Sequence, residues 1–315
     1  MKILVNDGIE PIGKKLLEEA GFEVDMNKIE QSDLMTRLNE YDAICVRSAT
    51  KVRKDLIDVC PNLKAIGRGG VGLDNIDVEH AGSKGIAVIN TPAASSRSVG
   101  ELAMAHMLTL ARFLHQSNRE MPANGDTKFN DLKKAYAKGY ELEGKTLGII
   151  GLGRIGQETA RTALGMGMTI LAYDPYVDEA TVSVGHVSLG FKHTIRTVPM
   201  QELLSGSDFI SLHIPSVDKP VLGREEFSSM KDGVFVVNCS RGGTIDEDAL
   251  IEALNSGKVA GAGLDVFENE PTPRKDLLSH PRVSLTPHIG ASTEEAQNKI
   301  GEELAQRIIA ALRGN

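Results

Sequence analysis

The stretch LGIIGLGRIG, residues 147–156, places three glycines directly after an apolar strand pattern and directly before a helical one. Gly151 suits a tight turn, Gly153 lets the backbone approach a pyrophosphate, and Gly156 allows close packing of helix against strand. The N-terminus of the following helix supplies amide donors for phosphate oxygens. A glycine turn that binds no ligand can have the same sequence. The flanking residues must therefore distinguish a dinucleotide-binding turn from a purely structural one.

An acidic residue follows at the distance that a ribose-binding carboxylate requires. The next strand pattern, MTILAYD, ends at Asp174, 18 residues after Gly156. A carboxylate there accepts hydrogen bonds from the ribose hydroxyls and repels a 2′-phosphate. The pattern therefore predicts a dinucleotide site that takes NAD in preference to NADP. A second glycine run, GRGGVG at 67–72, lacks the Lys-Ser/Thr ending of a nucleotide P-loop and is not interpreted as another such site.

Strand and helix patterns alternate on both sides of this turn. Five apolar runs before residue 91 are separated by amphipathic stretches, and six further strand patterns lie between residues 146 and 287. Alternation of this kind predicts parallel strands joined by helical crossovers. At 315 residues the chain has room for two domains. The predicted fold class is therefore α/β, with two Rossmann-like or flavodoxin-like parallel-sheet domains.

Three segments between the strand patterns lead to separate expectations. The apolar spacing over 96–114 predicts one long helix, whose length suits a connector or an oligomer contact. Residues 122–140 lose this periodicity and are expected to form a linker or surface loop. A strong amphipathic helix is expected after Thr293. Residues 181–197 match no pattern that we can interpret, and we expect His186 and His193 there to be solvated rather than metal-binding.

Composition excludes several classes of function. The formal charge is −8 and the basic residues form no stripe, which disfavours nucleic-acid binding. No apolar run approaches the ~20 residues of a membrane span, and the chain opens as a strand rather than a leader peptide. The three cysteines form no CxxC pair and lie in apolar stretches, which favours a reducing, cytoplasmic location and disfavours a disulfide scaffold. No metal site is expected.

Polar residues with catalytic chemistry follow the strand patterns of the second half. They are Arg241 in VVNCSRGG, Asp265 and Glu270 in GLDVFENEP, and His288 in LTPHIGAS. Arginine provides the planar charged fork that a substrate carboxylate requires. A histidine can accept a hydroxyl proton near neutral pH, and Glu270 can fix its tautomer. Taken singly, each has an ordinary explanation as a surface or core residue, but together they suit oxidation of a 2-hydroxy acid.

Further motifs extend along the whole chain: VRSATKV at 46–52, GRGGVGLDNID at 67–77, NTP at 90–92, and PHIGAST at 287–293. With the glycine turn and the stretches just named, they resemble the D-isomer-specific 2-hydroxyacid dehydrogenases, closest to the D-3-phosphoglycerate dehydrogenases. The resemblance implies an NAD-binding Rossmann domain at 98–290 and a discontinuous substrate domain at 1–97 plus 291–315. It also implies an active-site cleft between these domains.

The resemblance assigns roles to further residues. Arg241, Glu270 and His288 match the family's catalytic positions. Asp265 matches a residue near the nicotinamide carboxamide, and the positions lining the cofactor are matched by Arg154, Ile155, Ile214 and Cys239. Positions facing the substrate are matched by Arg47, Ser48, Gly70 and Val71. Arg47 is expected to meet a phosphate, and the backbone near Val71 the substrate carboxylate.

The activity implied is NAD-dependent oxidation of D-3-phosphoglycerate to 3-phosphohydroxypyruvate, the first step of phosphorylated serine biosynthesis. Arg47, Lys51 and Arg53 favour a phosphorylated substrate. A glyoxylate or hydroxypyruvate reductase, or another D-2-hydroxyacid dehydrogenase, is the nearest alternative, and a dinucleotide-sensing corepressor or scaffold is a third. The sequence matches no C-terminal regulatory domain, so serine inhibition through one is not expected. We expect a homodimer acting on a small-molecule substrate.

Overall fold

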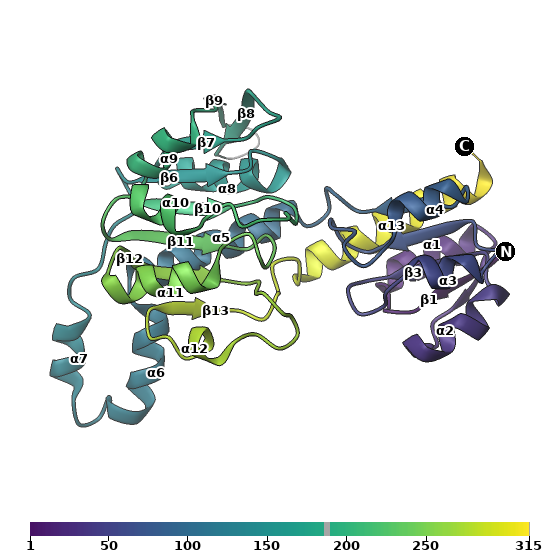
Figure 1. Cartoon of the computed structure of the whole chain (residues 1–315), viewed down its shortest axis with the longest axis horizontal. Helices are drawn as coiled ribbons and strands as arrows, with labels where there is room; N and C mark the ends of the chain where they lie inside the picture. The colour runs from purple at the N-terminus through teal and green to yellow at the C-terminus, as the bar shows by residue number, and fades with distance from the viewer. Residues whose placement is uncertain (186–189, 315) are drawn as a thin grey trace. The chain divides into compact units, whose positions relative to one another are not determined.

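The chain folds into two compact units, each built on its own parallel sheet. The computed structural model describes residues 1–185 and 190–314. One unit comprises residues 1–98 with the segment from 291 onward, and the other comprises residues 99–290. The elements of both are labelled in Figure 1. The two parallel sheets confirm the predicted α/β class.

The sheet of the first unit has the strand order β2-β1-β3-β4-β5, with all neighbours parallel. Its strands are β1 (Lys2–Val5), β2 (Glu23–Asp25), β3 (Ala43–Val46), β4 (Ala65–Arg68) and β5 (Ala87–Asn90). This is the flavodoxin-like order. Along β3, Ala43 and Cys45 belong to one buried cluster and Ile44 and Val46 to the other, because successive side chains point to opposite faces.

Helices cover both faces of this first sheet. They are α1 (Pro11–Glu19), α2 (Gln31–Arg37), α3 (Lys54–Asp58), α4 (Val78–Ser83) and α13 (Glu294–Arg313), with a short 3-10 helix, η1 (Leu38–Glu40). Leu17 of α1 shares a buried cluster with Leu304 and Ile308 of α13. Thr293 caps α13 by accepting a hydrogen bond from the amide of Ala296 at 3.2 Å. The predicted final helix is therefore part of the core of the first unit.

The sheet of the second unit has the strand order β13-β12-β11-β10-β6-β7, again parallel throughout. Its strands are β6 (Thr146–Ile150), β7 (Thr169–Tyr173), β10 (Phe209–Leu212), β11 (Val234–Asn238), β12 (Val259–Leu264) and β13 (Val283–Leu285). The strand order reverses between β6 and β10. In open parallel sheets, ligands bind outside the carboxyl ends of the strands at such a switch point.

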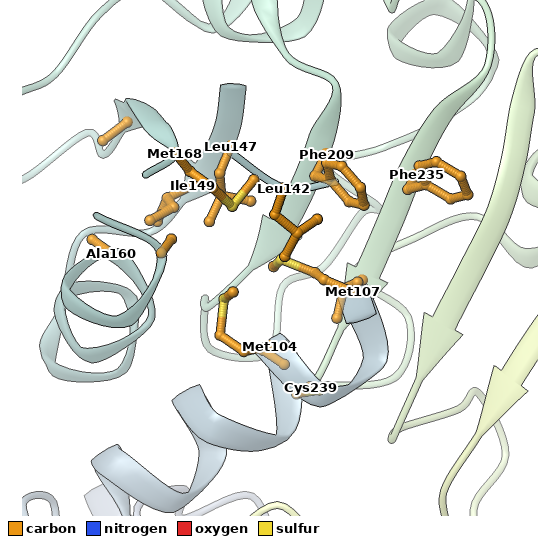
Figure 2. Packing of buried hydrophobic residues seen from close by; sticks show 14 of the residues in the cluster. Met104, Met107, Leu142, Leu147, Ile149, Ala160, Met168, Phe209, Phe235 and Cys239 are labelled. Carbon is orange, nitrogen blue, oxygen red and sulfur yellow. The ribbon is translucent and has the colours of Figure 1, made fainter. Parts of the chain in front are cut away.

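Two hydrophobic clusters flank the second sheet. The helices of this part are α5 (Ser96–Ala111), α6 (Leu114–Asn124), α7 (Phe129–Ala135), α8 (Arg154–Gly165), α9 (Met200–Gly206), α10 (Arg224–Ser229), α11 (Glu247–Ser256) and α12 (Lys275–Leu278). Figure 2 shows Met104 and Met107 of α5 directed toward the sheet. There the rings of Phe209 and Phe235 stack with centroids 4.9 Å apart. α5 is therefore a core helix.

The structure corrects two expectations about helices. The long helix expected over 96–114 ends at Ala111, and α6 starts at Leu114 after Phe113 adopts a positive φ of 55°. The loop expected at 122–140 contains the end of α6 and all of α7 (Figure 1). Leu132 of α7 is buried, and the helix has an acid in its first turn and two lysines in its last. These charges favour a helix too short to show periodicity.

Two paired strands lie in the segment that the sequence left uninterpreted. β8 (Glu179–Val184) and β9 (Phe191–Arg196) pair in antiparallel register. A parallel bridge from Thr197 to Ala172 joins the residue after β9 to β7. His193 is exposed on β9, as expected, and His186 lies outside the described residues.

Membrane-spanning helices and metal-binding clusters are both absent from the described residues. No helix in residues 1–185 and 190–314 is long and apolar enough to cross a membrane. Within the same ranges, no group of three His, Cys, Asp or Glu side chains has the geometry to hold a metal ion.

Candidate active site

The glycine turn lies between β6 and α8, at the switch point of the second sheet. A Cβ on Gly151 would lie 2.5 Å from the carbonyl oxygen of His213, and one on Gly156 would overlap the carbonyl of Gly151. Packing within the protein therefore requires both glycines. At Gly153, the N-cap of α8, a Cβ would have no described atom within 4 Å. This backbone is open in the way that an approaching pyrophosphate requires, so the turn fits a dinucleotide.

Asp174 directly follows β7, the neighbour of β6, and its carboxylate faces the glycine turn. Oδ2 accepts a hydrogen bond from the amide of Leu152 at 2.8 Å, and Oδ1 accepts one from the amide of Tyr176 at 2.8 Å. These bonds fix a negative charge beside the turn. That placement suits ribose hydroxyls and opposes a 2′-phosphate.

The remaining predicted cofactor residues lie at the same edge of this sheet. Arg154 and Ile155 open α8, while Ile214 follows β10 and Cys239 follows β11. The Cγ2 atom of Ile214 lies 2.9 Å from the position of a Cβ on Gly151, so these loops touch. Burial, reinforced by the charge of Asp265, raises the pKa of the Cys239 thiol, which is therefore neutral and serves packing.

His213 is a second histidine near the glycine turn. Its Nε2 lies 3.0 Å from the hydroxyl of Ser211, and Nδ1 is buried with no partner among the described residues. Burial lowers the pKa of the His213 ring to about 3. The ring is therefore neutral at physiological pH and is unsuited to act as a second proton acceptor.

His288 and Glu270 form a hydrogen-bonded pair. Nδ1 of His288 lies 2.8 Å from Oε2 of Glu270, and both side chains are partly exposed. Oε1 of Glu270 accepts a hydrogen bond from the amide of Phe267 at 3.0 Å. Although burial opposes ionisation, the hydrogen bond and charge of His288, with the charge of Arg241, hold the pKa of Glu270 below its ordinary value. Glu270 is thus ionised and Nδ1 carries the proton, which leaves Nε2 as the basic nitrogen.

Arg241 completes this constellation from the end of β11. Its Nη1 donates to the carbonyl of Ser240 at 2.7 Å, and its charge contributes to the lowered pKa of Glu270. β11, β12 and β13 are neighbours, so the residues that follow them meet at one edge of the sheet. The structure therefore places the three predicted catalytic residues together.

Asp265 supports the turn that carries His288. Its side chain is 1% exposed, and its carboxylate accepts hydrogen bonds from the hydroxyl of Thr286 at 2.6 Å and the amides of Ile289 and Gly290 at 2.8 and 2.9 Å. Its carbonyl accepts the amide of His288 at 2.8 Å. The sequence did not reveal this supporting role. No local pattern could reveal it, because Asp265 and Gly290 are 25 positions apart in the sequence.

The predicted substrate residues lie at the carboxyl ends of β3 and β4 in the first unit. Asp7 accepts the amide of Arg47 at 2.7 Å, and Asn75 donates to the carbonyl of Arg47 at 2.7 Å. These bonds fix the loop that also contains the exposed Ser48. A Cβ on Gly69 would lie 3.9 Å from Cγ of Arg47, so the two loops adjoin.

The second substrate loop is shaped by Arg68. Gly70 has a φ of +148°, and a Cβ there would lie 2.6 Å from Nη1 of Arg68. The carbonyl of Val71 accepts a hydrogen bond from the side-chain amide of Asn90 at 2.7 Å. The carbonyl of Gly70 accepts the backbone amide of Thr91 at 3.0 Å, so both predicted backbone positions are tied to the segment at the end of β5.

Comparison with known proteins identifies the family of this chain. Residues 104–290 match the family model described as D-isomer specific 2-hydroxyacid dehydrogenase, NAD binding domain. The chain belongs to this dehydrogenase family. It is 47% identical to hydroxypyruvate reductase of Thermotoga maritima, over 99% of this chain and 98% of that protein. It is 45% identical to D-3-phosphoglycerate dehydrogenase of Methanocaldococcus jannaschii, over 100% of this chain and 58% of that protein.

A solved structure supports the same assignment. The glyoxylate reductase from Paecilomyes thermophila superposes with a TM-score of 0.82 at 30% identity, covering 100% of this chain and 96% of that one. The dehydrogenase family assignment confirms the resemblance read from the sequence, the fold class and NAD as cofactor. The two relatives named above differ in substrate, and this chain spans little more than half of the phosphoglycerate dehydrogenase.

One of the three basic residues that favour a phosphorylated substrate is already hydrogen-bonded within the first unit. Arg53 donates to Asp77 at 3.0 Å and to the carbonyl of Asp74 at 2.7 Å. It is thus engaged in holding two loops of the first unit. Arg47 and Lys51 are the remaining basic candidates from that stretch for a substrate phosphate.

Proposed function

We propose that this D-2-hydroxyacid dehydrogenase uses His288 as proton acceptor, with Glu270 and Arg241 as its catalytic partners. The hydrogen bond between His288 and Glu270 is the observation that carries the proposal. Bound NAD supplies the hydride acceptor. Nε2 of His288 takes the hydroxyl proton of the 2-hydroxy acid as the C–H and O–H bonds give way to a carbonyl. Arg241 holds the substrate carboxylate and the adjacent oxygen.

For the substrate we propose D-3-phosphoglycerate, oxidised to 3-phosphohydroxypyruvate. Arg47 supports this choice, because its backbone is fixed by Asp7 and Asn75 while its guanidinium has no polar partner in residues 1–185 and 190–314. A fixed, unpaired arginine suits a phosphate. Hydroxypyruvate is the second candidate substrate, favoured by the relative that this chain matches over nearly its full length. The buried free cysteines support a cytoplasmic location.

A substrate panel separates these two candidates. We expect the NADH absorbance to report faster oxidation of 3-phosphoglycerate than of D-glycerate or D-lactate, and faster reduction of 3-phosphohydroxypyruvate than of hydroxypyruvate or glyoxylate. The reverse order in both directions would assign the chain to the reductases.

Replacing Arg47 by alanine tests the phosphate contact. We expect KM for 3-phosphoglycerate to rise by about tenfold or more, because one charge-assisted contact is lost, while KM for D-glycerate changes little. Arg37→Ala, which removes the same charge from the exposed side of α2, is the matched control. Equal losses on both substrates would make Arg47 a structural residue.

A further inference from the structure

A buried histidine on α5 is hydrogen-bonded at both ring nitrogens. His106 is 3% exposed, with Nδ1 3.0 Å from the hydroxyl of Ser284 and Nε2 3.0 Å from the hydroxyl of Thr286. Burial lowers the pKa of the His106 ring, which is therefore neutral. A Cβ on Gly263 of β12 would lie 2.6 Å from Cβ of His106, so the sheet has a glycine where this residue packs.

The direction of each hydrogen bond follows from the chemistry of the acceptor. The hydroxyl of Thr286 lies 2.6 Å from Oδ1 of Asp265 and must donate its only proton there, because a carboxylate can only accept. Thr286 therefore accepts from Nε2–H of His106. A neutral ring then has a bare Nδ1, which accepts the proton of Ser284. A one-way chain thus runs from Ser284 through His106 and Thr286 to Asp265.

This chain ends at the turn that carries the proton acceptor. Asp265 binds the amides of His288, Ile289 and Gly290, and His288 itself has a left-handed φ of +54°. A non-glycine residue in that region is held there by its surroundings. We propose that His106 is a positioning residue for His288. Its hydrogen bond to Thr286 orients the hydroxyl toward Asp265, and Asp265 then fixes the turn in the geometry in which His288 meets Glu270.

The inference rests on the proposed function, and the variants are chosen to separate the two. His106→Asn retains a polar atom near the position of Nδ1 but cannot reach Thr286. His106→Gln can place an amide N–H near the position of Nε2. We expect His106→Asn to lower kcat by about tenfold, with the Kd for NADH, read by fluorescence, changed less than twofold. His106→Gln is expected to recover most of kcat.

A mutant cycle tests the connection to Thr286. Because Thr286→Val breaks the same chain one step later, we expect the double variant His106→Asn/Thr286→Val to be no slower than Thr286→Val alone. We also expect the acidic limb of the oxidation profile of His106→Asn to move to lower pH, because a loosened turn weakens the contact between His288 and Glu270. His280→Asn, a histidine that precedes β13, is the control and should leave kcat unchanged.

The experiments distinguish failure of the proposed function from failure of the positioning role of His106. A wild-type protein that oxidises no 2-hydroxy acid and reduces no 2-keto acid would overturn the proposed function. An active wild type whose His106→Asn variant retains its kcat and pH profile would overturn only the positioning role. Equal losses in His106→Asn and His106→Gln, or additive losses in the cycle, would likewise make His106 a packing residue.

Discussion

At the scale of single residues, the proposed mechanism gives different tasks to the base and to the groups that orient it. His288 supplies the basic nitrogen, Glu270 fixes its tautomer, and Asp265 holds its backbone. The three tasks are distinct, because Glu270 binds only Nδ1 of the His288 ring, whereas Glu270 and Asp265 themselves act as hydrogen-bond acceptors. Substitutions at the three positions should therefore have different kinetic signatures.

Glu270→Gln tests the charge beside His288. The ionised carboxylate stabilises the imidazolium, so its removal makes protonation of the ring harder. Oxidation needs the neutral ring, and its acidic limb should move to lower pH. Reduction needs the protonated ring, so its limb should also move to lower pH and the rate at neutral pH should fall. Profiles of kcat/KM in both directions measure this, and two unmoved limbs would contradict the assigned pair.

Asp174→Asn tests cofactor choice. The amide keeps an oxygen for the backbone of Leu152 or Tyr176 but removes the charge that opposes a 2′-phosphate. We expect the ratio of kcat/KM with NADP to kcat/KM with NAD to rise by about tenfold, equivalent to about 1.4 kcal/mol. Initial rates with both cofactors give the ratio. An unchanged ratio would mean that another residue selects against NADP.

Residue roles could be predicted where the chemistry is local in sequence. Gly151, Gly153 and Asp174 all lie within one strand-turn-helix-strand pattern. By contrast, the chain from His106 to Thr286 joins residues 180 positions apart, and no local pattern reveals it. The hydrogen bond between Arg53 and Asp77 was not predicted for the same reason, because Asp77 lies on a different loop.

At the scale of elements, α13 is the clearest case of a helix whose sequence and packing agree. Its buried positions, Ile300, Leu304, Ile308 and Leu312, recur every four residues along one face. Three other elements, β8, β9 and α7, have no clear pattern in the sequence. β8 and β9 are stabilised by pairing with each other, and α7 is too short to show a period, so the sequence predicted neither.

Leu304→Ala tests the packing of α13. The side chain is 2% exposed, and truncation of a buried leucine costs about 2–5 kcal/mol through lost contacts and a residual cavity. We expect that loss in the free energy of unfolding of the first unit, measured in urea by circular dichroism. Glu302→Ala, on the exposed side of the same helix, should change it by less than about 0.5 kcal/mol. Equal losses of unfolding free energy in the two variants would contradict the core position of α13.

At the scale of the whole molecule, the expected homodimer remains a prediction. The apolar surplus of α5 is explained within the chain, because Ala103, Met104, Met107 and Leu110 are buried in its own core. Apolar side chains remain exposed along α5 and α6, namely Leu108 at 37%, Leu114 at 47% and Met121 at 42%. α6 and α7 extend away from the second sheet (Figure 1). This stretch is our candidate subunit contact.

Light scattering tests the dimer. We expect a mass of about twice the 33.9 kDa of one chain at micromolar concentration. Leu114→Glu combined with Met121→Glu places charges on the candidate contact and should yield the monomer. Leu278→Glu, at a comparably exposed leucine on α12, is the control and should remain dimeric. A wild-type monomer would refute the prediction outright.

Because the chain returns to its first unit only at α13, the strands of that unit are synthesised long before the helix that covers them. α13 covers one face of the first sheet, and a Cβ on Gly67 of β4 would already lie 2.6 Å from Ile308, so this helix is fitted closely to its strand. During synthesis the strands β1–β5 emerge early, but α13 follows only after residues 99–290. At a translation rate of about 5–20 residues per second, that face of the sheet stays without α13 for roughly 10 to 40 seconds. The nascent first sheet is therefore a natural client for chaperones throughout the translation of the second unit.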